Sequence, residues 1–203
     1  MYGLRNWCKW KRVGGNKVLR FKSHWPKLLM KLNKVSYGKN LLLYGYPYVF
    51  RTGQGKITIG DNVCINSDPM SNMLGMTQRT YIITKRTGEI SIGNNVGISG
   101  ASIYAWDSIV IGDHTKIGSG VKIMDTDFHP VDPQARLEGR DAEATKFAPI
   151  KIGKNVFIGC NALILKGTTI GDNCVIGAGS VVHGVFEDNC VIAGNPAKVI
   201  KRL

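Results

Sequence analysis

The sequence predicts an all-β protein built as a parallel β-helix, and three observations support this. Through the last third of the chain an aliphatic residue returns every six positions, glycine often follows it, and the fifth position of each hexad is usually small. The aliphatic positions are Ile152, Ile158, Ile164, Ile170, Ile176 and Val182. A period of six fits neither a helix nor a long alternating strand, but it fits a short strand followed by a corner. Three such units make a triangular coil of about 18 residues, and stacked coils bury the aliphatic side chains in columns.

The same hexads occur earlier, so we expect the β-helical domain to span residues 57–203. The earlier hexads begin at Ile59, Ile92, Ile98, Ile111 and Ile117. Their Gly, Asn and Asp residues tolerate the tight or left-handed backbone that corners require. Each buried Ile or Val contributes roughly 1.5–3 kcal/mol, but one coil cannot bury its own faces, so the coils must stack.

Two long segments interrupt the repeat. Residues 125–149 contain three prolines and no hexad, and the hexads on either side are out of phase. We expect an excursion loop at residues 124–149, and long irregular insertions in a regular scaffold are often functional. Residues 67–89 form the other interruption, in which Tyr81-Ile82-Ile83 predicts a strand.

Residues 1–56 are predicted to form a basic, partly helical N-terminal extension, with a helix near residues 25–36. The first 60 residues contain 13 Lys and Arg and no Asp or Glu, whereas the rest of the chain has 14 of each sign. The whole formal charge of +13 therefore belongs to this end. Lysines interleaved with Trp and Leu fit either a solvated cap or, through residues 1–40, an anionic membrane surface. The balanced body argues against a general nucleic-acid binder.

Composition also indicates the cellular compartment in which the protein works. The five cysteines are odd in number and form no CxxC pair, so we expect reduced thiols rather than a disulfide framework. The start lacks the apolar run of a secretory signal, and no apolar stretch is long enough to span a bilayer. We therefore expect a cytoplasmic protein, with a peripheral place at the inner face of the membrane as a variant of this.

The four histidines are the candidate general bases, because imidazole exchanges protons near neutral pH. His24 lies in the basic extension, His114 at a hexad corner and His183 on the outer side of the last repeat. His129 lies in the excursion loop, which makes it the favoured candidate.

Two stretches carry a resemblance to a known family. They are Ile123-Met124-Asp125-Thr126-Asp127-Phe128-His129-Pro130 and Ala193-Gly194-Asn195-Pro196-Ala197-Lys198-Val199-Ile200. With the hexads, they resemble the hexapeptide-repeat acyltransferases, especially the maltose and galactoside O-acetyltransferases and the capsule or lipopolysaccharide O-acetyltransferases. The resemblance implies a left-handed β-helix, an exception to the usual right-handed crossover, and a short helix at the C-terminus.

The function that this resemblance implies is acetyl transfer from acetyl-CoA, without a metal, to a hydroxyl of a sugar or polysaccharide precursor. The loop histidine of the family deprotonates the acceptor, which gives His129 that role. Asp125 and Asp127 are expected to orient the imidazole or bind the acceptor, or else to cap the loop. Some relatives have an Asn in the coil before the loop that helps hold the acceptor or the oxyanion. The matching stretch here, Ser99-Gly100-Ala101-Ser102, has none, so a backbone N–H or Ser99 is left to stabilise the oxyanion.

The resemblance also implies positions for the two substrates. Tyr104 and Trp106 could stack on a sugar ring or simply pack beneath the loop. Acetyl-CoA in this family lies in a groove between subunits, which implies a homotrimer closed by threefold symmetry. The matching cofactor-binding positions are Cys160, Ala178, His183, Lys198 and Lys201. The two lysines also fit an ordinary charged terminus.

Other functions remain as alternatives. A β-helix carbonic anhydrase needs three histidines on zinc, and His129 has no second histidine at short spacing. A non-catalytic β-helix scaffold would need neither a loop histidine nor basic residues near the C-terminus. Among acyltransferases, an amino sugar, serine or an antibiotic is an alternative acceptor, and a longer acyl chain is an alternative donor.

Overall fold

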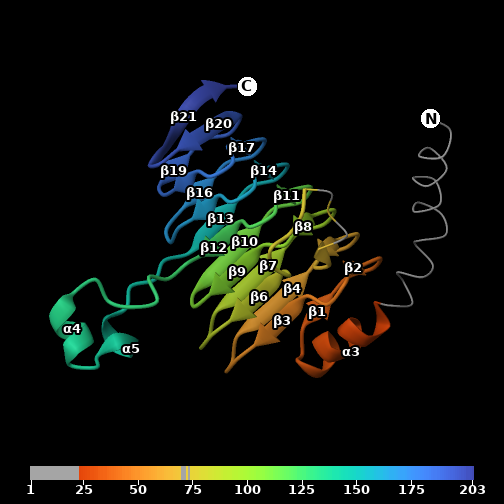
Figure 1. Cartoon of the computed structure of the whole chain (residues 1–203), viewed down its shortest axis with the longest axis horizontal. Helices are drawn as coiled ribbons and strands as arrows, with labels where there is room; N and C mark the ends of the chain where they lie inside the picture. The colour runs from red at the N-terminus through yellow and green to blue at the C-terminus, as the bar shows by residue number, and fades with distance from the viewer. Residues whose placement is uncertain (1–22, 70–71, 73) are drawn as a thin grey trace.

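Three parallel sheets form the sides of a triangular prism (Figure 1). The computed structural model describes residues 23–69, 72 and 74–203, which make six complete coils. Sheet A consists of β1 (Ser36–Tyr37), β4 (Lys56–Ile59), β7 (Glu89–Ile92), β10 (Ser108–Ile111), β13 (Ile150–Ile152), β16 (Thr169–Ile170) and β19 (Val185–Phe186). Sheet B consists of β2 (Leu42–Tyr44), β5 (Cys64–Asn66), β8 (Gly97–Ser99), β11 (Lys116–Ile117), β14 (Phe157–Ile158), β17 (Val175–Ile176), β20 (Cys190–Gly194) and β21 (Ala197–Arg202). Sheet C consists of β3 (Tyr48–Arg51), β6 (Tyr81–Thr84), β9 (Ser102–Ala105), β12 (Lys122–Met124), β15 (Leu163–Ile164) and β18 (Val181–Val182).

Aliphatic columns fill the prism, as the hexads predicted. In sheet A the register aligns one isoleucine of each strand with an isoleucine of the next coil. One such column contains Ile59, Ile92, Ile111, Ile152 and Ile170, each at most 2% exposed. The strand inside the first interruption, Tyr81-Ile82-Ile83, is also confirmed as β6.

The corner between sheets A and B is held by polar side chains. Its non-glycine residues with left-handed backbone have φ angles between 54° and 63°, and they are Asn40, Asn62, Asn95, His114, Asn155, Asn173 and Asn189. The residue before each one often caps the neighbouring coil: Asp113 Oδ1 accepts the Asn94 N–H at 2.7 Å. Asp172 Oδ1 accepts the Lys154 N–H at 2.6 Å in the same way. His114 is thus an exposed turn residue, as expected.

The predicted excursion loop leaves the prism between β12 and β13 and projects away from it (Figure 1). It contains two short helices, α4 (Pro133–Leu137) and α5 (Asp141–Ala144). An isolated bridge between Thr126 and Phe147 joins its two arms where they leave the prism. The loop is therefore a folded excursion whose two ends return to adjacent coils.

The N-terminal part differs from the expectation, because the β-helix starts earlier. The strands β1, β2 and β3 form a complete coil within residues 36–51, which we expected to belong to the extension. One helix, α3 (His24–Leu32), precedes this coil and lies at the end of the prism opposite the C-terminus (Figure 1). It ends before the predicted residue 36, because Lys34 has a left-handed φ of 55° and the first strand follows. Residues 1–22 lie outside the described part of the chain.

The prediction of a short C-terminal helix is wrong. Residues 197–202 form β21, which pairs antiparallel with β20. An unpaired β20 would leave a row of free N–H and C=O groups at the edge of sheet B, and the returning strand satisfies them. The β-branched pair Val199-Ile200 favours a strand over a helix for the same segment. In the part of the chain that is described, no helix has the length and apolar character needed to cross a bilayer.

The close stacking at the corners makes glycine necessary at some positions. A Cβ atom at Gly112 would lie 2.5 Å from the carbonyl carbon and oxygen of Gly153 in the next coil. We expect Gly112→Ala to lower the free energy of unfolding by about 1–3 kcal/mol, because the next coil must shift. Urea denaturation would measure this.

Gly97→Ala is the matched control. Its Cβ would meet only the flexible Lys116 side chain, at 3.1 Å, so the change should stay within about 0.5 kcal/mol. Equal stability of the two variants would contradict this account of the corners.

Candidate active site

The excursion loop presents His129 to solvent next to a carboxylate. The His129 side chain is 72% exposed, and its Nδ1 lies 2.5 Å from Oδ1 of Asp141 on α5. Phe128, just before it, has a left-handed φ of 63°, and the His129 N–H bonds to the Asp127 carbonyl at 2.7 Å. With Nδ1 donating to the carboxylate, the neutral ring keeps its acceptor lone pair on the exposed Nε2. This is the arrangement that a general base needs.

Asp125 anchors the root of the loop. Its side chain is fully buried and accepts the backbone N–H groups of Trp106 and Asp107, both at 2.8 Å. Burial raises the pKa of this carboxyl above its ordinary value, and the two N–H groups act in the opposite direction. Asp125 thus takes the loop-capping role that the sequence left open, and its carboxylate faces neither His129 nor solvent.

Two further contacts hold the arms of the loop. Asp127 Oδ1 pairs with Lys166 Nζ at 2.6 Å, and both side chains are about one-quarter exposed. Arg86 donates from Nη1 to the Ala142 carbonyl at 3.2 Å, which ties α5 to the corner between sheets C and A. Asp127 therefore contacts Lys166, and Asp141 is the acid that contacts His129.

Tyr104 and Trp106 pack at the base of the loop. Trp106 Nε1 donates to the Tyr104 hydroxyl at 3.2 Å, and the Tyr104 ring lies 5.0 Å from the ring of Phe128. Trp106 is only 8% exposed, with the guanidinium of Arg86 over its indole at 5.3 Å. This contact pattern matches the packing role more closely than an open sugar-stacking platform.

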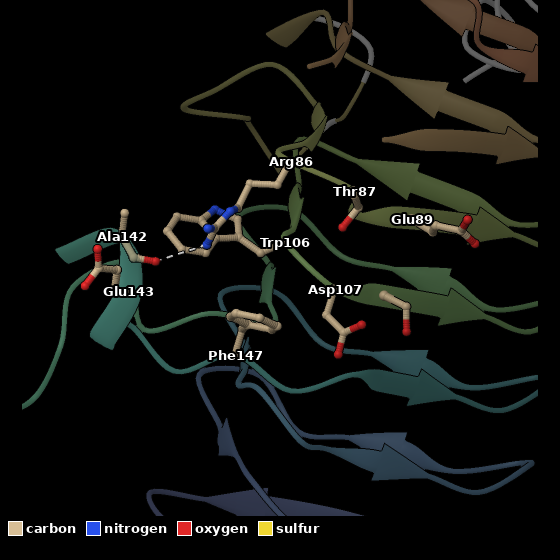
Figure 2. Close-up of a pocket in the computed structure, with 9 residues that line it drawn as sticks. Arg86, Thr87, Glu89, Trp106, Asp107, Ala142, Glu143 and Phe147 are labelled. Carbon is tan, nitrogen blue, oxygen red and sulfur yellow. Dashed lines mark hydrogen bonds between the residues drawn. The ribbon is translucent and has the colours of Figure 1, made fainter. Parts of the chain in front are cut away.

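A cavity of about 670 Å³ lies between α5 and sheet A (Figure 2). Its aromatic wall is Trp106 and Phe147, and the carboxylates of Glu89, Asp107 and Glu143 surround it. In the described part of the chain none of these three carboxylates has an ion-pair partner. The cavity therefore offers hydrogen-bond acceptors and the Arg86 guanidinium beside apolar ring surface. Two of its lining residues, Ala142 and Glu143, belong to α5, the helix that carries Asp141.

The small residues predicted to lie along the pantetheine arm share one corner, between sheets B and C. The Asn161 N–H bonds to the Ser119 carbonyl, and the Gly179 N–H bonds to the Cys160 carbonyl, both at 2.9 Å. Ser119, Cys160 and Ala178 thus lie in successive coils. Ser99 lies at the same side of the prism, at the end of β8, and its Oγ accepts the Asn66 side-chain amide at 2.9 Å.

The remaining predicted residues lie at the C-terminal end. His183 is exposed at the corner between sheets C and A, after β18. Lys198 and Lys201 are exposed on β21. His129 projects from the corner between sheets C and A, whereas Cys160 and Ala178 lie at the corner between sheets B and C. One chain therefore does not bring the histidine and the small-residue corner together.

Sequence reasoning missed Asp141, Arg86 and Lys166. The loop holds four acids after His129, namely Asp132, Glu138, Asp141 and Glu143, and spacing alone does not select among them. The available sequence signal, acidic residues suited to the first turn of a helix, fits both Asp141 and Glu143 and does not separate them. Among the described residues no group of three or more His, Cys, Asp or Glu could hold a metal ion.

The comparisons with known proteins agree with this architecture. Residues 149–183 match the family model described as the hexapeptide repeat of succinyl-transferase. The chain is 32% identical to WbbJ of Escherichia coli (strain K12), whose name assigns it to lipopolysaccharide biosynthesis as an O-acetyl transferase, over 84% of this chain and 83% of that one. It is 41% identical to the galactoside O-acetyltransferase of the same organism, over 56% of this chain and 57% of that one.

A solved galactoside acetyltransferase in complex with coenzyme A superposes with a TM-score of 0.52 at 29% identity, covering 82% of this chain and 64% of that one. The matched region is little more than half the length of several relatives. The hexads, the prism and the inserted loop define an acyltransferase with a left-handed parallel β-helix. The chain belongs to the hexapeptide-repeat acyltransferase family, as its match with WbbJ over most of both chains shows.

The anchoring role of Asp125 can be tested by its removal. We expect Asp125→Ala to lower the free energy of unfolding by about 1–3 kcal/mol, because two buried N–H groups lose their acceptor. Thermal or urea unfolding measures the loss, and limited proteolysis reports whether the loop is cut sooner.

Asp127→Ala serves as the comparison, since it removes a partly exposed ion pair whose contribution should stay near about 0–1 kcal/mol. An Asp125→Ala protein as stable as the parent would remove Asp125 from its role as anchor.

Proposed function

We propose that this protein is an acetyl-CoA-dependent O-acetyltransferase that acts on a hydroxyl of a sugar or polysaccharide precursor, with His129 as general base. The observation that carries the proposal is the exposed imidazole on the excursion loop, with its Nδ1 2.5 Å from Asp141. The names of the two Escherichia coli relatives support O-acetyl transfer, and the coenzyme A in the solved relative supports the donor.

The proposed reaction is a direct transfer. The acceptor hydroxyl gives its proton to Nε2 of His129 while its oxygen attacks the thioester carbonyl. The tetrahedral oxyanion collapses, the C–S bond breaks, and the coenzyme A sulfur leaves with the proton returned by the imidazolium. Asp141 keeps Nδ1 protonated and stabilises the charged ring between the two steps.

Ser99 is our candidate for stabilising the oxyanion. Because its Oγ accepts the Asn66 amide, its own O–H is left to donate. A hydroxyl held in this way by a fixed neighbour is a preorganised donor of the kind that acyl transfer uses. A backbone N–H at the glycine-rich corner beside it is the alternative donor.

We propose that the site is completed by a neighbouring subunit in a homotrimer. His129 lies at one corner of the prism and the small-residue corner at another, so a second copy is needed to bring Cys160 or Ala178 to the imidazole. Phe157, on the outer face of sheet B, is 52% exposed and suits such a contact. His183, Lys198 and Lys201 would then lie near the nucleotide, where cationic side chains favour its phosphates.

A hydroxyl-rich acceptor fits the surroundings of the loop. The cavity beside α5 combines aromatic walls with the carboxylates of Glu89, Asp107 and Glu143, which accept hydrogen bonds from sugar hydroxyls (Figure 2). An amino sugar would suit the same carboxylates. The basic N-terminal segment adds to the proposal a peripheral place at the inner surface of the membrane.

The base is tested by His129→Ala. We expect kcat for acetyl transfer to fall by about two to four orders of magnitude, because the acceptor proton has no recipient. Transfer to a panel of sugars and nucleotide sugars measures the change, and acetyl-CoA binding by calorimetry should persist. A variant that keeps full activity would exclude His129 as the base.

Asp141→Asn tests the orienting carboxylate. We expect kcat to fall by about one to two orders of magnitude with little change in the KM for acetyl-CoA, because the imidazole loses its fixed tautomer. Glu138→Gln is the control, since Glu138 pairs with Arg140 elsewhere in the loop and should leave kcat unchanged. Equal kcat values for Asp141→Asn and the parent would contradict the orienting role.

A further inference from the structure

The N-terminal end of the prism exposes an apolar surface that we name the α3 face. Only Pro26 and Met30 of the α3 helix are buried. The exposed residues of the α3 face, with their exposed fractions, are Trp25 (60%), Leu28 (46%), Leu29 (47%), Leu32 (72%), Tyr46 (56%) and Phe50 (40%). Single exposed apolar residues are ordinary, but a contiguous group of this size on a nine-residue helix and the adjoining coil marks a contact surface.

The α3 face is hollowed as well as apolar. A cavity of about 760 Å³ lies between α3 and β3, and Leu29, Leu32 and Phe50 are among its lining residues. Arg51 and Arg79 also line it. Apolar side chains beside guanidinium groups suit a partner that has both hydrocarbon and negative charge.

The positive charge of the N-terminal end narrows the choice of partner for the α3 face. Residues 1–60 contain 13 basic residues and no acid, and within the described part Lys27, Lys31 and Lys34 lie on or just after α3, while Lys39 follows the first strand. The nearest acid in sequence is Asp61, whose Oδ1 accepts the Lys39 N–H. A second copy of this chain would bring two positively charged surfaces together, which disfavours self-association through this face. Anionic lipid headgroups over acyl chains match both the cations and the apolar side chains.

We propose that the α3 face docks this protein on the surface of an anionic lipid bilayer, with the N-terminal end of the prism toward the membrane. The helix would lie in the interface, where Trp25 and the leucines reach the acyl boundary and the lysines remain at headgroup level. In a homotrimer three such faces would act together, and linked weak contacts add in avidity.

This orientation places the catalytic loop at a definite height, an inference that rests on the proposed function. Sheet C runs in the order β3-β6-β9-β12, and the loop leaves after β12, three strands from β3. At about 4.8 Å between strands, the loop leaves the prism about 14 Å above the first coil. In this orientation the loop would face an acceptor sugar that is attached to a lipid of the same membrane.

Vesicle sedimentation of the full-length protein tests the docking. We expect binding to phosphatidylcholine vesicles that contain about one-third phosphatidylglycerol, little binding to pure phosphatidylcholine, and a marked loss at high salt. Leu28→Ser with Leu32→Ser should weaken binding by about tenfold or more, because the interfacial apolar area is lost. The matched control is Val131→Ser with Leu137→Ser, which removes similarly exposed side chains from the excursion loop and should leave binding unchanged.

Two double lysine variants test the contribution of positive charge. Lys31→Gln with Lys39→Gln should weaken binding to the anionic vesicles, whereas Lys151→Gln on β13 with Lys154→Gln in the turn that follows should not. Equal binding to both kinds of vesicle, or equal loss in the control variants, would overturn the proposal. Concentration-dependent self-association that disappears in Leu28→Ser with Leu32→Ser would overturn it in favour of a second copy.

Activity separates this inference from the proposed function. The α3-face variants should transfer acetyl to a soluble sugar acceptor at the parental rate, and His129→Ala should still bind anionic vesicles. If no acetyl transfer is found for any variant but vesicle binding follows the predictions, the docking stands and the proposed reaction fails.

Discussion

The structure depends on one constraint: each coil must lie directly on the coil below it. The aliphatic columns satisfy this constraint inside the prism, because an isoleucine of one strand contacts the isoleucine at the same register in the next. The corners satisfy it outside, where Asp and Asn side chains take the N–H groups of the neighbouring coil. An added atom at a stacked position pushes two coils apart, because the backbone of the next coil cannot move aside locally. A single Cβ atom at Gly112 would have this effect.

This rigidity explains how an exposed histidine can be held in place. The loop that carries His129 starts and ends in adjacent coils, so its two ends are fixed before any contact inside the loop forms. Buried Asp125, the Asp127–Lys166 pair and the Arg86–Ala142 hydrogen bond then tie the arms and α5 to the prism. His129 and Asp141 are therefore held on a rigid scaffold, as their proposed acid–base role requires.

Charge is divided along the prism in a way that fits the two proposals. The first 60 residues carry only basic charges and the α3 face is partly apolar, whereas three carboxylates and Arg86 line the cavity beside α5. A basic surface attracts anionic lipid, whereas a cavity lined mainly by carboxylates disfavours anionic groups and accepts an uncharged or cationic sugar. Under the two proposals, this separation would keep lipid headgroups out of the acceptor site when the protein approaches a negatively charged membrane.

The sequence by itself determined the prism and the place of the excursion loop, because six-residue periodicity and its interruptions are local properties of the chain, and it made His129 the candidate base. Only the tertiary structure decided that Asp141, rather than Asp125 or Asp127, contacts His129, since that choice depends on how Arg86 and Lys166 fold the loop against distant coils. The first coil lacks clear hexads. The C-terminal strand forms because it pairs with the edge of β20 that would otherwise be unpaired. Neither feature could be predicted from local sequence pattern. Side-chain contacts between residues far apart in sequence are set by packing, which periodicity does not encode.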